Sequence, residues 1–322
     1  MKEVTKFKKI IDKEIINLEL PNSPNNLYEP IKYILSLEAK RMRSVALLIA
    51  HQLYKEDYQN ALDAALAVEM FHNFTLIHDD IMDNASLRRG SDTVHKKWNK
   101  NIAILSGDTL LVKSYMMLLN LDSKIQNQVI KKFSETAVVV CEGQQMDMDF
   151  ENQSHLNIDD YINMIEKKTS VLFATSFEIG SIIGGASKSD QNLLYQFGLN
   201  LGIAFQLQDD LLDLYADQSK FGKKVGGDII ANKKTFLFLK SLSLANAKQK
   251  EDLLKLYSSI DFNSSEKISK VKSIFDSLSI YESTSKIINV YHKRALESLK
   301  KITVKNKDSL NYFVNLLVKR EL

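Results

Sequence analysis

The stretch LIHDDIMD, residues 76–83, places three aspartates inside an apolar segment. On a helix, Asp79 and Asp83 lie one turn apart and project from the same face, whereas Asp80 points about 100° away from them. Two like charges on one face repel each other, and a hard cation such as Mg²⁺, which prefers carboxylate oxygens, would relieve that repulsion. The spacing therefore favours a metal site on a helix, with a solvated acidic helix end as the alternative.

A second stretch, FQLQDDLLD at residues 205–213, repeats this spacing with Asp209, Asp210 and Asp213. Both triplets are set among apolar residues, where unpaired carboxylates are costly. Two such acidic faces on separate helices are explained more economically as opposing walls of one pocket, filled by metal and diphosphate, than as two solvated helix ends.

The distribution of proline indicates the fold class. All three prolines lie within residues 21–30, and none follows from Ile31 to Leu322. Because proline costs ~3 kcal/mol in a helix interior, the rest of the chain is free to be helical. Apolar residues recur at three- and four-residue steps. They predict helices at residues 1–18, 31–38, 43–55, 60–83, 102–120, 124–150, 158–183, 190–216 and 233–245, with several more up to residue 320. With no repeat, linker or long alternating pattern, we expect a single all-α domain over residues 1–322.

Composition excludes some classes of function. The chain has 322 residues, with 43 Lys plus Arg against 40 Asp plus Glu, and the net charge of +3 gives no reason to expect a nucleic-acid or anionic membrane partner. Its single cysteine, Cys141, follows three valines, which predicts a core position and fits a reducing compartment. No apolar run approaches the ~20 residues that span a bilayer, and the N-terminus lacks a signal-peptide pattern. We expect a cytoplasmic protein.

Several basic residues are placed where they could bind anions. Lys40 and Arg43 lie three apart at the start of a predicted helix, and Arg88 and Arg89 follow the first triplet in a turn closed by Gly90. For any one pair a salt bridge is the better interpretation. As a set, arginine forks and compact lysine charges suit two diphosphates. Further phosphate candidates are Lys168, Thr169, Lys223, Lys224, Lys233 and Lys234, the last four around a turn at Gly226 and Gly227.

His72 lies two turns before Asp79 and shares its face, but a single helical histidine is more often structural than a ligand. Together with Glu69 it also spells the Glu-x-x-His pattern of di-iron helix bundles. No other histidine has a glutamate three residues before it, which argues against the di-iron interpretation.

These residues resemble the trans-isoprenyl diphosphate synthase family, also called polyprenyl synthetases, over roughly residues 40–235. The stretches 76–90 and 205–213 resemble its two aspartate-rich motifs, and Gly143, Gln144 and Asp147 resemble its Gly-Gln-x-x-Asp element. Lys168 with Thr169 resembles the Lys-Thr pair at a helix break. The resemblance implies an all-helical bundle of the isoprenoid synthase type, usually a homodimer, with a central apolar pocket between long helices.

The resemblance also implies roles for single residues. Asp79 and Asp83 would bind two magnesium ions, and Asp209, helped by Asp213, would bind a third. The residues that would hold the allylic diphosphate are Arg88, Lys168, Lys223 and Lys233. Those that would hold isopentenyl diphosphate are Lys40, Arg43, His72 and Arg89. Thr169 and Gln206 would turn their oxygens toward a developing carbocation.

The reaction that the family implies fits these groups. Metal ions held by the aspartates, together with basic side chains, would stabilise the departing pyrophosphate, so that the allylic carbon–oxygen bond could ionise. The double bond of isopentenyl diphosphate attacks the cation, and loss of a proton leaves a product longer by five carbons. Water must be excluded throughout, which gives an apolar pocket a chemical purpose.

Product length is inferred from the residues before the first triplet. Phe74 stands five residues before Asp79, with Met70 and Phe71 a turn earlier, and in the family a bulky residue here forms the floor of the pocket that receives the growing chain. Ordinary core packing is the alternative. We expect a product of fifteen or twenty carbons, and the two-residue spacer Ile81, Met82 favours twenty, geranylgeranyl diphosphate, over farnesyl diphosphate.

Three residues depart from the family pattern. Ala39 and Ser44 replace a glycine and a proline that flank the Lys-Arg-x-Arg element, which predicts altered loop geometry rather than lost activity. Ala231 replaces an acidic or amide residue, without an assigned consequence. Among rival functions, a terpene cyclase would carry a different second metal motif, and a non-catalytic regulatory subunit would lack some of the aspartates or arginines. A purely structural scaffold would not gather acidic and basic groups around one cleft.

Overall fold

The computed structural model describes residues 2–153, 155–216, 226–258, 263–304 and 306–318. Residue contacts divide the chain into two compact units. Unit 1 comprises Met1–Thr136, Phe173–Tyr195 and Ile302–Phe313, and unit 2 comprises Ala137–Leu172, Gln196–Lys301 and Val314–Leu322. The fold is all-α, as predicted, and the single-domain interpretation stays a prediction.

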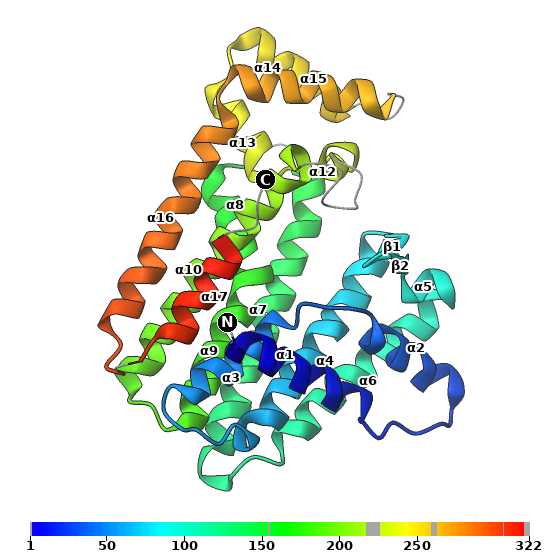
Figure 1. The fold of residues 1–322 in the computed structure, drawn as a ribbon. Coiled ribbons are helices and arrows are strands. Elements are labelled where there is room, and N and C mark those ends of the chain that lie inside the picture. Colours follow the sequence, from blue (N-terminus) through cyan, green and yellow to red (C-terminus); the bar gives the residue numbers. More distant parts are fainter. Residues whose placement is uncertain (1, 154, 217–225, 259–262, 305, 319–322) are drawn as a thin grey trace. The chain divides into compact units, whose positions relative to one another are not determined.

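Unit 1 contains the N-terminal helices and a short hairpin (Figure 1). Its elements are α1 (Lys2–Ile16), α2 (Asn25–Ser36), α3 (Met42–Gln52), α4 (Gln59–Met82), β1 (Leu87–Arg88), β2 (Ser91–Asp92), α5 (Val94–Lys97) and α6 (Lys100–Leu118). Four further helices contribute residues to both units: α7 (Ser123–Asn152), α9 (Val171–Gly184), α10 (Lys188–Tyr215) and α17 (Asp308–Val318). Within unit 1, α4 packs along α6 and against α3, which places the end of α4 beside the hairpin.

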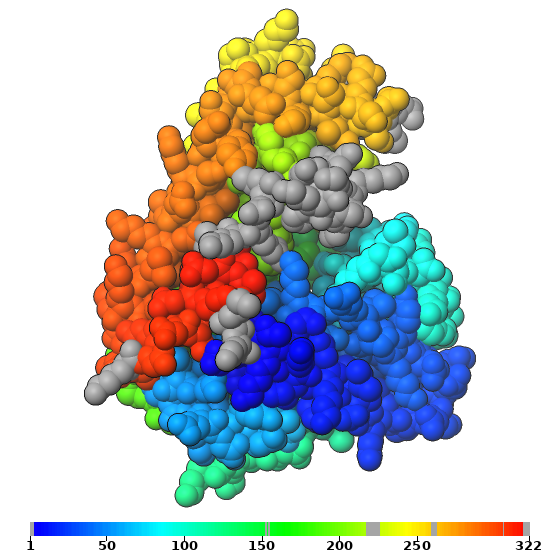
Figure 2. All heavy atoms as spheres, in the orientation of Figure 1, coloured from blue at the N-terminus to red at the C-terminus, as the bar shows by residue number. Residues whose placement is uncertain are grey.

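Unit 2 contains the remaining helices. They are α8 (Ile158–Ile165), the π-helix η1 (Glu166–Ser170), α12 (Gly227–Ile230), α13 (Phe236–Leu244), α14 (Ala247–Ser258), α15 (Ser264–Ser277) and α16 (Ile280–Lys301). Helix α15 packs against α12, α14 and α16, and Figure 2 shows α14, α15 and α16 as one continuous yellow-to-orange surface. The core beneath includes Leu207 and Leu211 of α10, Phe236 of α13 and Phe275 of α15.

Apolar periodicity accounts for most of these helices. Helix α1 buries Val4, Phe7, Ile11 and Ile15, which follow one another at three- and four-residue steps and form a single face. This burial, rather than intrinsic propensity, supplies most of the helical stability.

The prediction was wrong about the proline segment. Helix α2 begins at Asn25, directly after Pro24, and contains Pro30 in its interior, whereas we predicted a helix only from residue 31. Pro30, Ile31, Ile34 and Leu35 are all buried, so apolar packing offsets the lost backbone hydrogen bond. The short helix α5 was not predicted.

The predicted helix at residues 158–183 is divided into α8, η1 and α9. The π-helical turn covers Lys168 and Thr169, where the family resemblance placed a helix break. Glu166–Ser170 contains no proline or glycine that would mark a break, so apolar periodicity alone predicted one continuous helix.

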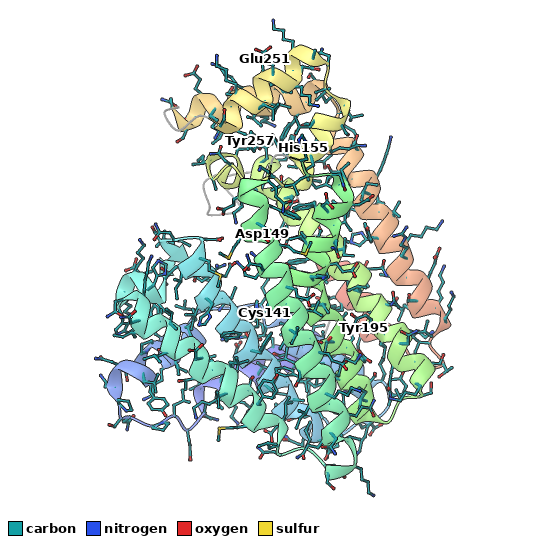
Figure 3. The ribbon with its side chains drawn as sticks, turned by 180° about the vertical axis from the view of Figure 1, so that it is seen from behind. Cys141, Asp149, His155, Tyr195, Glu251 and Tyr257 are labelled. Carbon is teal, nitrogen blue, oxygen red and sulfur yellow. The ribbon has the colours of Figure 1, made fainter. Side chains whose placement is uncertain are left out.

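Cys141 is exposed on α7 (Figure 3), so the predicted core position is wrong. Of the valines before it, Val140 is buried whereas Val138 is exposed. An apolar run on a helix turns through all directions, and only some of its members reach the core. In the described ranges, no helix is long and apolar enough to cross a membrane.

Candidate functional site

The first aspartate triplet lies at the end of α4 in unit 1. Asp80 is buried, with 1% of its surface exposed, whereas Asp79 is half-buried and Asp83 is exposed. Burial raises the pKa of Asp80, and the hydrogen bonds of Arg88 oppose that shift. The outer two carboxylates are therefore the more accessible ones, and Asp80 points away from them into the protein.

Arg88 is held against this triplet by the β1–β2 hairpin. Its Nε donates to Asp80 Oδ1 at 3.0 Å, and its Nη2 donates to Asp79 Oδ2 at 3.3 Å. The hairpin pairs Leu87 with Asp92 and Arg88 with Ser91, so Arg89 and Gly90 form a two-residue turn. Both have positive φ, 55° and 77°, which is the geometry of a type I′ turn.

Arg89 is half-buried, and burial lowers the pKa of its guanidinium. Its Nη1 is buried and has no hydrogen-bond partner among the described residues. A buried donor without a partner costs roughly 1–3 kcal/mol, and an anionic ligand would supply the acceptor.

Arg43 and His72 are brought together by α3 and α4. Arg43 Nη1 lies 3.2 Å from His72 Nε2, and because an arginine can only donate, Nε2 accepts and the proton of a neutral imidazole sits on Nδ1. Burial, followed by the charges of Arg43, Arg89 and Arg88, lowers the pKa of His72 well below its usual range. His72 is therefore a neutral side chain within a group of cations. Lys40 lies two residues before the start of α3, the helix that carries Arg43.

Ser44 and Ala39, the departures from the family pattern, are both buried. Ser44 Oγ donates to Glu69 Oε2 at 2.9 Å, so the hydroxyl has a partner on α4. The other carboxylate oxygen of Glu69 accepts from Arg41 Nη1 at 2.8 Å. Glu69 is thus part of a polar network in unit 1.

The residues predicted to form the pocket floor lie in an aromatic cluster. Phe74, Phe71 and Met70 are all buried. The Phe74 ring centroid lies 5.5 Å from that of Phe71 and 4.7 Å from that of His78. Phe71 in turn packs edge-on against Phe133 at 5.2 Å. Phe74 lies about one and a half helical turns before Asp79. The packing of Phe71 against both Phe74 and Phe133 holds its ring in place.

The second triplet lies on α10 in unit 2. Asp210 is buried, accepting from Tyr161 Oη at 2.6 Å and from Gln206 Nε2 at 3.3 Å. Burial, followed by the charge of Asp228, raises the pKa of Asp210 well above its usual range. Asp209 and Asp213 are half-buried. The middle aspartate of each triplet is thus a buried anchor, and the outer two remain accessible.

The π-helix η1 presents Lys168 and Thr169 to α7 and α10. Lys168 Nζ lies 2.6 Å from Asp147 Oδ2, and Thr169 Oγ1 donates to Gln206 Oε1 at 3.4 Å. Two glycines allow the backbone of η1 to approach α7 and α10 closely. A Cβ on Gly143 would lie 2.2 Å from the backbone nitrogen of Lys168, and one on Gly202 would lie 2.8 Å from Ser170 Cα.

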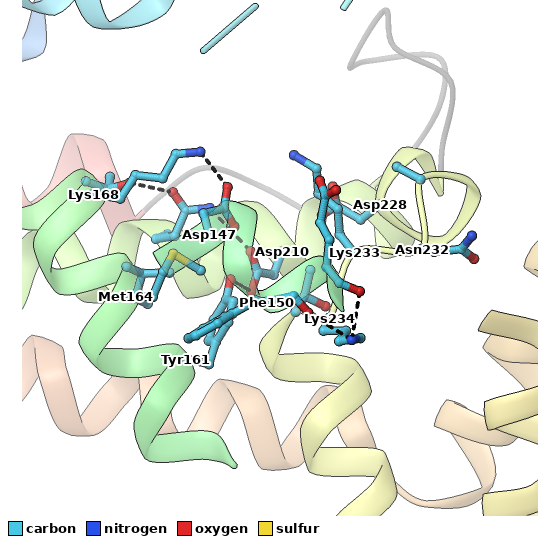
Figure 4. Close-up of a pocket in the computed structure, with 16 residues that line it drawn as sticks. Asp147, Phe150, Tyr161, Met164, Lys168, Asp210, Asp228, Asn232, Lys233 and Lys234 are labelled. Carbon is cyan, nitrogen blue, oxygen red and sulfur yellow. Dashed lines mark hydrogen bonds and ion pairs between the residues drawn. The ribbon is translucent and has the colours of Figure 1, made fainter. Parts of the chain in front are cut away.

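A polar pocket of about 120 Å³ in unit 2 connects these groups (Figure 4). Its walls include Asp147, Lys168, Gln206, Asp228 and Lys233. Phosphate candidate Lys234 also borders the pocket, but its Nζ donates to backbone carbonyls at the end of α7, at 2.8 Å to Phe150 and 3.1 Å to Glu151. It acts as a C-terminal cap for that helix. Lys223 and Lys224 lie outside the described residues.

Sequence reasoning assigned no role to Asp228 or Tyr161, and both belong to this site. Asp228 donates its backbone N–H to Asp213 Oδ2 at 3.0 Å, and burial together with the Asp213 charge raises the pKa of Asp228 to about 6. Its position directly after a double glycine was the available indication. For Tyr161 the sequence held no such indication, because a tyrosine among apolar residues is usually part of the core.

The carboxylates of the two triplets are the oxygen donors available for a divalent cation. In the parts of the chain that the structure describes, no group of three or more His, Cys, Asp or Glu side chains is arranged to hold a metal ion by itself. Mg²⁺ is commonly held by one or two carboxylates together with substrate phosphates. The accessible pairs, Asp79 with Asp83 and Asp209 with Asp213, supply that chemistry. The interpretation of the two triplets as opposing walls of one pocket stays a prediction.

The chain is similar to known proteins over most of its length. The sequence model of the family described as polyprenyl synthetase matches residues 24–278. The chain is 34% identical over 316 residues to the geranylgeranyl diphosphate synthase of Sulfolobus acidocaldarius, which covers 95% of this chain and 94% of that protein. It is 40% identical over 235 residues to the geranylgeranyl diphosphate synthase of Methanosarcina mazei, covering 71% of each. A crystal structure of a geranylgeranyl pyrophosphate synthase matches with a TM-score of 0.94 at 40% identity, covering 99% of both chains.

Proposed function

Because the chain belongs to the polyprenyl synthetase family, we propose that it condenses isopentenyl diphosphate with an allylic diphosphate to give geranylgeranyl diphosphate. The observation that carries the proposal is the pair of aspartate triplets, each with a buried middle residue and two accessible outer ones. The names of the similar proteins support a short-chain product of twenty carbons. Farnesyl diphosphate is the alternative product.

Membership of this family implies the use of a divalent metal ion. We assign it as Mg²⁺, about three ions per site, with Asp79 and Asp83 as ligands on α4 and Asp209 and Asp213 on α10. When bound, the ions would neutralise charge on the departing pyrophosphate.

The basic residues bind and orient the two diphosphates. Arg88, Lys168 and Lys233 are assigned to the allylic diphosphate, together with Lys223. Arg88 and Lys168 are paired with aspartates here, so each exchanges a carboxylate partner for phosphate oxygens when substrate binds.

The isopentenyl diphosphate is assigned to Lys40, Arg43, His72 and Arg89. The neutral imidazole of His72 donates one hydrogen bond without adding a further charge to the surrounding cations. The unpartnered Nη1 of Arg89 gains an acceptor in the same step.

Thr169 and Gln206 are assigned to the developing carbocation. Their side chains are bonded to each other in unit 2, which fixes both oxygens relative to η1 and α10. Such fixed dipoles need no reorganisation when charge develops.

We also propose a homodimer that uses α6. Apolar residues of this helix point outward as well as inward: Leu105, Val112 and Met116 are exposed on it, and Leu119, directly after its end, is exposed too. A helix of that kind is ordinarily covered by a partner. The cytoplasmic location stays a prediction.

The test is an elongation assay with purified protein, Mg²⁺, labelled isopentenyl diphosphate, and dimethylallyl, geranyl or farnesyl diphosphate as primer. We expect elongation of at least one primer, and a loss of about 100-fold or more in kcat with Asp79→Ala or Asp209→Ala. Asp63→Ala on α4 and Asp252→Ala on α14 are controls that leave the rate unchanged. Absence of turnover with every primer, or full activity in both triplet variants, contradicts the proposal.

A further inference from the structure

Arg41 in unit 1 is a buried cation that the assigned reaction does not use. Its side chain is 3% exposed, and its backbone adopts φ 51°, the left-handed region that non-glycine residues rarely occupy. Such a conformation persists only where surrounding contacts hold it. The position of this guanidinium is therefore strongly determined.

Four acceptors from different elements fix Arg41. Its Nη1 donates to Glu69 Oε1 of α4 at 2.8 Å, and its Nε donates to Asp12 Oδ1 of α1 at 3.0 Å. Its Nη2 donates to the backbone carbonyls of Leu35 at 2.7 Å and Leu37 at 3.4 Å, at the end of α2. One side chain thus joins α1, α2 and α4 at the start of α3.

Glu69 is fully engaged in the same network. Its Oε1 also accepts from Asn73 Nδ2 at 3.2 Å, and its Oε2 accepts from Ser44 Oγ at 2.9 Å. Ser44 stands where the family pattern has proline, so this bond arises from a departure of this chain. Buried charges that are paired and hydrogen-bonded on all sides specify a single arrangement of their neighbours.

The network lies next to the residues assigned to isopentenyl diphosphate, both at the start of α3 and on α4. Arg41 lies between Lys40 and Arg43 in the chain, and Glu69 lies one helical turn before His72, whose ring contacts Arg43. A shift of Arg41 therefore moves the backbone that carries Lys40 and Arg43. Asp12 is the outermost member of the network and the one contributed by the N-terminal helix.

We propose that Asp12 is a positioning residue for isopentenyl diphosphate binding, acting through Arg41 on Lys40 and Arg43. The proposal rests on the assignment of those two residues under the proposed function. Asp12 touches no substrate itself, and its role is to hold Arg41 from the side of α1, so that the phosphate-binding end of α3 keeps one conformation.

The test compares Asp12→Ala with the native chain in steady-state kinetics for each substrate separately. We expect the KM for isopentenyl diphosphate to rise about tenfold, and the KM for the allylic primer and kcat to change by less than about twofold. Lys8→Ala is the matched control. Lys8 Nζ bonds the other oxygen of Asp12 at 2.8 Å on the same helix but does not contact Arg41, so its loss leaves both KM values unchanged.

A double-mutant cycle separates positioning from general loss of stability. In a Lys40→Ala, Arg43→Ala background, Asp12→Ala should add less than about twofold to the KM for isopentenyl diphosphate, because its effect passes through Arg43 and Lys40. Equal increases in both KM values, or full additivity in the cycle, overturn the proposal. If Arg43→Ala alone leaves the KM unchanged, the assignment of the isopentenyl diphosphate site fails instead. Asp12→Asn, which keeps an acceptor oxygen, should recover part of the native KM.

Discussion

Phe74 on α4 is the residue for which we predict that packing sets product length. Its ring lies between the first triplet and a set of aromatic rings that continues through Phe71 to Phe133. We therefore propose that an apolar product chain growing along α4 would stop at this ring, because Phe71 and Phe133 occupy the space behind it.

Replacing Phe74 with alanine should lengthen the product beyond twenty carbons. The substitution removes the ring and leaves a cavity, at a cost of about 3–5 kcal/mol in unfolding free energy. Products are separated by chromatography after dephosphorylation. Phe236→Leu, a buried substitution in unit 2, is the control for destabilisation alone, and it should leave product length unchanged. An unaltered distribution in the Phe74 variant would show that the floor lies elsewhere.

For single residues, the sequence predicted the directions of the aspartates better than their hydrogen-bond partners. The helical spacing correctly separated the outer aspartates from Asp80 and Asp210, since two residues one turn apart must share a face. It could not predict that Arg88 pairs with Asp80, or that Tyr161 bonds Asp210, because these contacts join segments that are distant in the chain. Cys141 was misplaced because an apolar run does not specify which of its side chains face inward.

Among the elements, η1 shows most clearly the limit of periodicity. The sequence predicted the helices on either side of it, and the family resemblance placed a break at Lys168 and Thr169. Periodicity alone gave one continuous helix. Helix α2 is the opposite case, because Pro30 argued against a helix that apolar burial nevertheless stabilises.

Gly202→Ala should disturb η1 directly. The added Cβ would lie 2.8 Å from both Cα and Cβ of Ser170, so α10 and the π-turn must move apart. We expect a loss of about 1–3 kcal/mol in unfolding free energy, and a rise in the KM for the allylic primer through Lys168. Denaturant unfolding and steady-state kinetics measure the two effects. Asn192→Ala, an exposed change on the same helix, should alter neither, and a Gly202 variant with native stability would refute the steric argument.

For the whole molecule, the sequence predicted the all-α class, which proline placement and periodicity fix together. It did not predict the division of the chain into two compact units, because this depends on which segments contact one another in space. The exposure of apolar side chains on α6 could not be predicted either, because an apolar helix is expected to be buried until its neighbours are known.

The dimer proposal predicts that α6 controls assembly. Light scattering after gel filtration should give twice the mass of one chain for the native protein and the mass of a single chain for a Leu105→Glu, Met116→Glu variant. A charge at each position would have to be desolvated in the interface. Leu254→Glu, at a leucine of α14 that is 48% exposed, should stay dimeric. A native protein with the mass of one chain would disprove the proposal.

The left-handed backbone of Arg41 restricts how this chain can be improved by engineering. A survey of strained φ values would recommend glycine there, since glycine adopts φ 51° without steric cost. That change would relax the backbone and at the same time leave Glu69 buried without its cation. The backbone conformation favours glycine at this position, whereas the buried charge of Glu69 requires arginine. Mutations meant to raise thermal stability therefore have to keep Arg41 and act on the neighbouring helices instead.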